Sequence, residues 1–258
     1  PLTRKEEMAA PIAIQLYTVR DLLAKNFKTV VTQIAEMGYV GVETAGFPGI
    51  SVVEASDLFA DLGLQVCSAH TQLPYGKQKN QVIELADALE ISRVVSSTSR
   101  DDFNSIDSIK ALCDRWNEAA EVADEFDLEL GLHNHWWEFS QLEGRMAFDV
   151  LIENLDERIF FQIDTYWVNT GGGDASQIVE KLGERAPLLH MKDGPCTQDS
   201  DMVAVGDGEM DFSQIVEASH GTSDWLIVEL DRCETDIMEA VEKSYNYLVK
   251  HDLARGAN

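Results

Sequence analysis

The feature that most constrains the fold is a regular alternation of short apolar runs with longer amphipathic segments along almost the whole chain. Apolar runs that end in polar residues are typical of buried parallel strands, and the amphipathic segments between them are typical of helices that cover a sheet. The predicted strands are residues 12–16, 39–43, 64–70, 93–97, 128–133, 159–164, 187–190 and 225–229. The chain is therefore predicted to consist of strand–helix units.

Helical periodicity fills the intervals near residues 27–37, 52–62, 77–89, 147–154, 175–182 and 212–218, and two longer helices reach about residues 126 and 250. Eight such units close naturally into a barrel, because closure leaves no sheet edge. An open doubly wound sheet would need a glycine-rich turn after the first strand, and the string QLYTVRD has no glycine. We therefore predict a single α/β domain, a (β/α)8 TIM barrel over residues 1–258, with residues 1–10 as a flexible N-terminal extension.

The charge of the chain limits its partners. Its 46 acidic and 20 basic residues give a net charge of −26, and a field of that sign repels phosphate backbones and anionic membrane surfaces. No run approaches the roughly 18 apolar residues of a membrane span. The sequence thus predicts neither a nucleic-acid nor a membrane partner, and leaves a homo-oligomer open.

The cysteines indicate a reducing compartment. Cys67, Cys113, Cys196 and Cys233 are scattered and form no CxxC pair, which favours free thiols and a cytoplasmic protein. Residues 1–10 lack the basic start and apolar stretch of a signal peptide. The chain begins with Pro1 and not with Met, which is consistent with removal of a preceding segment.

Polar residues stand at the downstream ends of six predicted strands. They are Glu43, His70, the string His133-Asn134-His135, Asp164, His190 and Glu229. One such residue is usually a cap or an ion-pair partner, but in a barrel these strand ends converge on one rim, where catalytic groups gather. Their shared position predicts a functional site.

The chemistry of these residues favours one divalent metal ion. Carboxylates and imidazoles without thiolates suit Mn²⁺, Mg²⁺, Co²⁺ or Zn²⁺. The alternative is a hydrogen-bonded ring without metal, in which clustered carboxylates would repel one another and raise their pKa values. We expect the metal.

Several strings resemble the sugar phosphate isomerase/epimerase group of the xylose isomerase-like barrel superfamily. They are GLHNHWWEF, QIDTYWVNTGGGD, LLHMKD, VGDGEMDF and LIVELD, and the resemblance runs from Ile12 to about Leu248. It implies that Asp164, His190 and Glu229 are metal ligands.

The fourth ligand departs from the pattern of the superfamily. Many members carry Glu at the end of the fifth strand, where this chain has His133. We expect His133 to be the ligand, with Glu138 as the alternative. Epimerases of the superfamily use that Glu as one of two opposed acid/base groups, so its absence argues against a symmetrical two-glutamate mechanism. A His at this place resembles the inosose dehydratases.

The resemblance implies removal of a proton from a carbon next to a carbonyl, with a metal-stabilised enediolate. Glu229 is the predicted base, and His135 and His70 are alternates. Lys192 is predicted to steady an enediolate oxygen or a phosphate; an ion pair with Asp193 is the other interpretation.

Further residues are predicted to line the substrate pocket. Trp136, Trp137, Tyr166 and Trp167 flank the predicted ligands, and aromatic faces often bind the apolar faces of sugars, although such residues also pack under loops. Tyr17, after the first strand, is expected to point into the mouth of the barrel. Glu43, His70, Trp137, Trp167 and Lys192 complete the predicted substrate-binding set.

The leading hypothesis is a metal-dependent isomerase or epimerase that acts on a small carbohydrate. A dehydratase or lyase for a keto-sugar or keto-inositol is the alternative. A metal-dependent phosphodiester hydrolase is disfavoured by the charge of −26. A non-catalytic carbohydrate-binding barrel would not need Asp164, His190 and Glu229 together.

Overall fold

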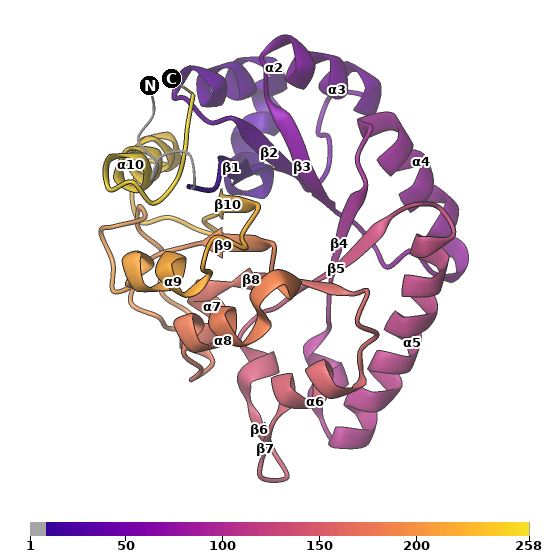
Figure 1. The fold of residues 1–258 in the computed structure, drawn as a ribbon. Helices are drawn as coiled ribbons and strands as arrows, with labels where there is room; N and C mark the ends of the chain where they lie inside the picture. Colours follow the sequence, from indigo (N-terminus) through magenta and orange to yellow (C-terminus); the bar gives the residue numbers. More distant parts are fainter. Residues whose placement is uncertain (1–8, 258) are drawn as a thin grey trace.

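The eight predicted strands form a closed parallel barrel in the computed structural model, which describes residues 9–257 (Figure 1). Around the barrel the strands follow the order β1-β10-β9-β8-β5-β4-β3-β2. Their bounds are β1 Ile12–Gln15, β2 Gly41–Thr44, β3 Gln65–His70, β4 Arg93–Ser97, β5 Glu129–His133, β8 Phe160–Asp164, β9 Leu188–Met191 and β10 Trp225–Val228. The predicted TIM barrel is confirmed.

Helices surround the barrel on its outer side (Figure 1). Their bounds are α2 Arg20–Glu36, α3 Val52–Asp61, α4 Lys79–Leu89, α5 Ile106–Asp124, α6 Ala147–Asn154, α7 Thr165–Thr170, α8 Ala175–Leu182, α9 Phe212–Ala218 and α10 Ile237–Lys250. Helix α2 begins at Arg20, well before residue 27, because it continues through the non-helical Asn26. The short helix α7 and the hairpin of β6 (Gln141–Leu142) and β7 (Arg145–Met146) were not predicted.

The inner face of the barrel changes from apolar to polar along the strands. Near the strand starts it is filled by Ala13, Cys67, Val95, Phe160, Leu188, Trp225 and Ile227. Gly41 leaves room for the ring of Trp225, since a Cβ there would lie 2.4 Å from it. Because alternate residues of a strand share a face, the inward positions after Leu188 are His190 and then Lys192. The polar side chains at this end of the barrel thus point inward because they occupy every second position of their strands.

One carboxylate anchors the loop that follows β9. Asp193 is fully buried and accepts hydrogen bonds from the backbone N–H groups of Gly194, Gly206, Gly208 and Met210 at 2.8–3.1 Å. A Cβ at Gly208 would lie 2.1 Å from this carboxylate, so the contact requires glycine there. Both ends of the loop are therefore fixed to one side chain.

The predicted flexible extension, residues 1–10, lies mostly outside the described residues. Its last residue is ordered by a hydrogen bond from Arg255 N–H to the Ala10 carbonyl at 2.8 Å. Within residues 9–257, no helix is long and apolar enough to cross a membrane.

Candidate metal centre and active site

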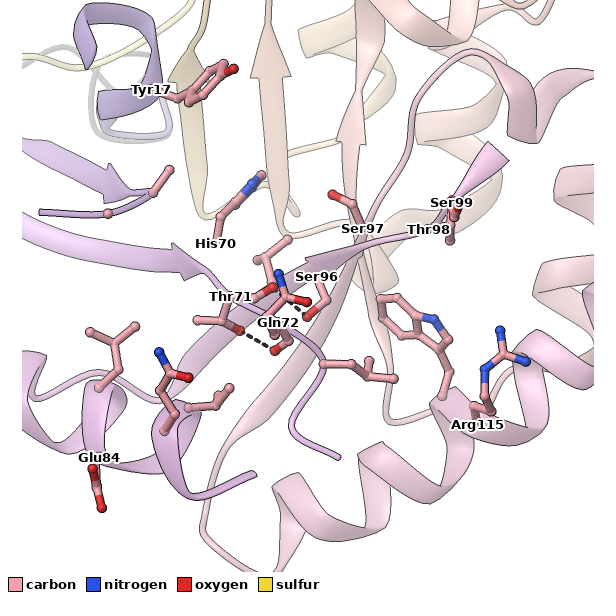
Figure 2. Close-up of a pocket in the computed structure, with 18 of the residues that line it drawn as sticks. Tyr17, His70, Thr71, Gln72, Glu84, Ser96, Ser97, Thr98, Ser99 and Arg115 are labelled. Atoms are coloured by element: carbon pink, nitrogen blue, oxygen red, sulfur yellow. Dashed lines mark hydrogen bonds between the residues drawn. The ribbon is translucent and has the colours of Figure 1, made fainter. Parts of the chain in front are cut away.

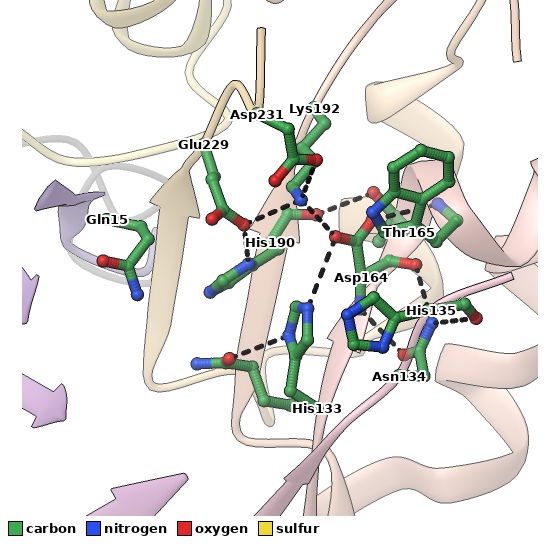
Figure 3. Close-up of polar contacts among 12 residues, drawn as sticks. Gln15, His133, Asn134, His135, Asp164, Thr165, His190, Lys192, Glu229 and Asp231 are labelled. Carbon is green, nitrogen blue, oxygen red and sulfur yellow. Dashed lines mark hydrogen bonds and ion pairs between the residues drawn. The ribbon is translucent and has the colours of Figure 1, made fainter. Parts of the chain in front are cut away.

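Four predicted ligands meet at the C-terminal end of the barrel: His133, Asp164, His190 and Glu229. One ligand atom of each lies within 4.8 Å of those of the other three, and all four side chains are buried (Figure 3). They come from β5, β8, β9 and the residue after β10. His70 forms a second group with His133 and His190 by the same criterion. The strand-end positions expected from the sequence thus converge on one point.

The two imidazoles at this point are each oriented by a hydrogen bond on one ring nitrogen. The Nδ1 atom of His133 lies 3.0 Å from Oε1 of Gln162, which can only accept, so Nδ1 donates. On His190, Nε2 donates to Oε1 of Glu43 at 2.7 Å. The other nitrogen of each ring faces the cluster. This is the arrangement by which outer residues orient metal-binding histidines.

The protonation states of His133 and Glu229 also suit metal binding, whereas His190 would have to lose a proton on binding a metal. Burial opposes protonation of His190, but Glu43 and Glu229 outweigh it and raise the pKa of this imidazole to about 10. Burial, together with the charges of the neighbouring histidines, holds the pKa of His133 well below its ordinary value, so this imidazole is neutral. Burial opposes ionisation of Glu229, but Lys192 and His190 outweigh it and keep the pKa of this carboxyl well below its ordinary value. A neutral imidazole and an ionised carboxylate are the forms that bind cations.

Glu43 is a supporting residue and has no exposed surface. Its carboxylate accepts hydrogen bonds from Gln15 at 2.7 Å, from Ser68 and from Gln162, besides the one from His190. Both oxygens are therefore occupied by neighbouring side chains. These contacts enclose the carboxylate of Glu43, which was expected to bind substrate, between His190 and its other side-chain partners.

Lys192 lies among three carboxylates. Its Nζ is 2.8 Å from Oδ2 of Asp164, 2.8 Å from Oε2 of Glu229 and 2.8 Å from Oδ2 of Asp231 (Figure 3). These partners raise the pKa of Lys192 well above its ordinary value, although burial opposes them. The ion pair with Asp193 that the sequence left open is absent, because Asp193 binds backbone N–H groups instead.

Glu138, the alternative fourth ligand, faces other partners. Its buried carboxylate accepts a hydrogen bond from Thr98 and another from the backbone N–H of His135 at 2.9 Å. The group formed by Asp164, His190 and Glu229 contains His133 and does not contain Glu138. The geometry therefore favours His133.

The predicted proton-transfer alternates lie at the edge of the cluster. Nε2 of His70 is 2.7 Å from Oε1 of Gln162, and 21% of the His70 side chain is exposed. The ring of His135 stacks on that of Trp137 at 4.1 Å, and 27% of the His135 side chain is exposed. Both imidazoles can thus be reached from the solvent.

A cavity of about 950 Å³ adjoins the cluster at His70 (Figure 2). Tyr17, Thr71, Gln72, Ser97 and Thr98 line the part near the mouth of the barrel, and Leu112 and Trp116 line the part beside α5. Of the other aromatic residues expected in the pocket, Trp137 donates from Nε1 to Thr98 at 3.0 Å. The ring of Trp167 lies 5.6 Å from Nζ of Lys192.

The cluster suits a divalent ion. Two carboxylates and two imidazoles form a donor set typical of Mn²⁺, Co²⁺ and Zn²⁺ sites. The buried Oδ2 of Asp164 receives no well-aligned hydrogen bond, although the ammonium of Lys192 lies 2.8 Å from it. This oxygen is therefore paired with a cation already, and a metal ion would share it with Lys192.

The sequence reasoning missed four residues of the site: Gln15, Ser68, Gln162 and Asp231. Gln162 and Asp231 could have been found, because they lie two residues before Asp164 and two after Glu229 and so share their inward face. Gln15 occupies the end of β1, where only the following Tyr17 was considered. Ser68 lies two residues before His70 and could have been found by the same rule, but its pairing with Glu43 depends on the irregular register between β2 and β3.

The fold and the cluster together define the class of the protein: the chain belongs to the xylose isomerase-like TIM barrel family, whose model matches residues 31–251. No curated protein matches it. Among solved structures, a sugar phosphate isomerase/epimerase from Parabacteroides distasonis is similar, with 23% identity and a TM-score of 0.79 over 95% of this chain and 94% of that one.

Two further structures share the fold. The probable 3-DHS dehydratase AsbF from Bacillus anthracis is 13% identical, with a TM-score of 0.75 over 93% of this chain and 98% of that one. The IOLI protein, whose structure has a bound zinc atom, is 14% identical, with a TM-score of 0.70 over 94% of this chain and 98% of that one. At these identities the likeness concerns the fold.

Proposed function

We propose that the protein is a divalent-metal-dependent isomerase or epimerase of a small carbohydrate, and that it transfers a proton at a carbon next to a carbonyl. The observation that carries this proposal is that the two carboxylate oxygens of Glu229 have different surroundings. Its Oε2 faces His190 at 2.7 Å and Lys192 at 2.8 Å, whereas no residue among 9–257 donates a hydrogen bond to Oε1. One oxygen is thus held in the cluster and the other is available to take a proton.

We assign His133, Asp164, His190 and Glu229 as the residues that hold the metal. When bound, a divalent ion supplies Lewis acidity that polarises the carbonyl of the substrate. Glu43 and Gln162 support the metal centre by fixing the two imidazoles, as described above. The distances of 2.7 and 3.0 Å on which this assignment rests are those of ordinary hydrogen bonds.

Glu229 is the proposed base: it accepts the proton of the carbon next to the carbonyl. Return of this proton to the neighbouring carbon gives isomerisation, and return of a proton to the opposite face gives epimerisation. His70 and His135 are the proposed partners for the second transfer, because both imidazoles are partly exposed at the edge of the cluster.

The substrate is proposed to enter through the cavity beside His70. Tyr17 lines it, and Trp137 and Trp167, which lie beside the site next to Thr98 and Lys192, are proposed to bind the apolar face of the sugar. Lys192 is proposed to supply positive charge next to the substrate oxygen that becomes negative. The net charge of −26 supports a small-molecule substrate over a nucleic acid.

A dehydratase is the second candidate, and His133 favours it. At the end of β5 this residue presents an imidazole that burial keeps neutral, so no carboxylate stands there to act as a second base. In this reaction Glu229 takes the proton next to the carbonyl, the bond from the neighbouring carbon to its hydroxyl breaks, and a protonated histidine converts the leaving hydroxide into water.

The test is incubation of the protein with a panel of ketoses, keto-sugars and keto-inositols in deuterated water, with Mn²⁺, Mg²⁺, Co²⁺ or Zn²⁺. Metal-dependent incorporation of deuterium without loss of water, followed by NMR, is the expected result, and Glu229→Gln should abolish it. Loss of water would establish the dehydratase instead. If neither reaction depends on metal and on Glu229, the proposal is wrong.

A further inference from the structure

Lys192 is the most deeply buried charged amine of the site, with only 1% of its side chain exposed. It contacts three carboxylates from two chain segments: Asp164 at the end of β8, and Glu229 and Asp231 after β10. A single carboxylate would neutralise a buried ammonium. The surplus of acidic partners therefore calls for an explanation.

Two of these partners have a second role. The oxygens nearest to Nζ are Oδ2 of Asp164 and Oε2 of Glu229, and the same two atoms face His133 at 3.8 Å and His190 at 2.7 Å. Lys192 thus contacts one carboxylate oxygen of each of two proposed metal ligands. The third partner differs, because Asp231 lies outside the group of ligand atoms and 29% of its side chain is exposed.

The charges of Lys192 and its three carboxylates sum to zero only with a divalent ion, since those of His190 and Glu43, which face each other at 2.7 Å, cancel. Asp164, Glu229 and Asp231 carry three negative charges and Lys192 one positive charge, so a dication makes the group neutral. Without the dication, the ammonium is the group that contacts both Asp164 and Glu229, while His190 contacts Glu229 at 2.7 Å. With it, two cations share these oxygens, and the charge of Lys192 must be balanced mainly by Asp231.

We propose that Lys192 is an internal counter-cation of the metal centre and that Asp231 is the carboxylate that takes over its charge when a metal binds. The pair then sets how tightly the protein holds its metal. This inference rests on the proposed metal site and assigns to it a positioning residue, Asp231, that touches neither metal nor substrate.

The proposal predicts changes of opposite sign. In Lys192→Met a positive charge next to the metal is removed, so Zn²⁺ should bind at least about tenfold tighter. In Asp231→Asn the ammonium loses its third partner and competes more strongly for Asp164 and Glu229, so Zn²⁺ should bind about tenfold more weakly. Lys181→Met, which removes a surface ion pair with Asp149, is the matched control and should leave the affinity unchanged.

The experiment measures Zn²⁺ affinity by competition with a chromogenic chelator in the full-length protein and its variants. Thermal unfolding with and without Zn²⁺ supplies a second readout. Without metal, Lys192→Met should unfold at a lower temperature than the wild type, and Zn²⁺ should raise its melting temperature by more. Lys192→Arg, which keeps the charge, should restore most of the stability of the metal-free protein.

If the Zn²⁺ affinities of Lys192→Met and Asp231→Asn both fall, or both stay unchanged, the proposal is overturned while the metal site remains in place. If Lys192→Met does not fold under either condition, Asp231→Asn decides, and unchanged or tighter Zn²⁺ binding by this variant rejects the proposal. A wild type that binds no metal would refute the metal centre and the inference together. Metal binding with the predicted shifts but without turnover would refute only the proposed function.

Discussion

The two ends of the barrel both carry cations among carboxylates, but in different surroundings. At the N-terminal ends of the strands, Arg93 pairs with Glu129 at 3.0 Å and with Asp224 at 2.7 Å, and 53% and 51% of these acidic side chains are exposed. At the C-terminal ends, Lys192 meets three carboxylates and 1% of its side chain is exposed. Water screens the first group and not the second.

The two ends of the barrel therefore differ in what their charged groups contribute to the protein. Exposed ion pairs contribute little to stability and can be exchanged freely. A buried group of excess carboxylates is costly unless a cation balances it. The exposed end of the barrel therefore serves the fold, and the buried end has the charge excess expected of the proposed metal centre.

Asp164→Ala should have the largest effect. It removes a ligand whose oxygen lies within 4.8 Å of the other three ligand atoms, and loss of a metal that contributes several kcal/mol of transition-state stabilisation lowers activity by about 10³-fold or more. Metal content by plasma mass spectrometry should fall from one equivalent to near zero. Asp149→Ala, at the surface, is the control; a fully loaded Asp164→Ala protein would remove the basis for the site.

Glu43→Gln should weaken metal binding by about 10- to 100-fold, the usual cost of losing an outer partner of a ligand. The amide keeps the shape of the side chain but loses the charge that accepts from His190 at 2.7 Å. Chelator competition measures the effect, and Glu153→Gln, which faces Arg145 at the surface, is the matched control. Equal affinities in the two variants would show that Glu43 does not support His190.

Arg93→Ala tests the opposite end of the barrel. The variant loses two ion pairs and the packing of the guanidinium 5.9 Å from the ring of Phe160, so the free energy of unfolding should fall by about 1–2 kcal/mol. Urea denaturation gives this value, and Arg93→Met separates the packing from the charge. Metal affinity should stay unchanged, and a tenfold loss would mean that the two ends are coupled.

Asp156→Asn should have the smallest effect and a distinct pH dependence. Hydrogen bonds from the side chain and backbone of Arg158 lower the pKa of Asp156 to about 2. A carboxyl whose pKa is lowered by folding stabilises the protein above its ordinary pKa and loses this contribution as the pH falls through about 2. The variant should be less stable by about 1 kcal/mol or less at pH 7. The urea midpoints of the wild type and the variant, measured at pH 7, 4 and 3, should approach each other as the pH falls. A difference that grows at low pH would contradict this assignment.

The strands and the residues of the candidate metal centre could be predicted from the sequence because both follow a local rule. A short apolar run marks a strand, and the polar residue at its end marks the rim. The same two-residue period joins His190 to Lys192 and Glu229 to Asp231. The inward position of Lys192 could therefore be predicted from the sequence, and that of Asp231 could have been predicted by the same rule. The contacts of Glu43 were not, because Gln15, Ser68 and Gln162 come from three other strands whose register the sequence does not express.

The anchor at Asp193 has a consequence for how proteins with this barrel can diverge. Because one carboxylate ties down the chain at Gly194 and again at Gly206 and Gly208, and Met202, Ala204 and Val205 are packed in the core, only the more exposed residues 195–201 of this loop can vary without disturbing His190 or Lys192. Changes in that exposed segment would then alter the surface of the loop while the cluster beneath it keeps its geometry.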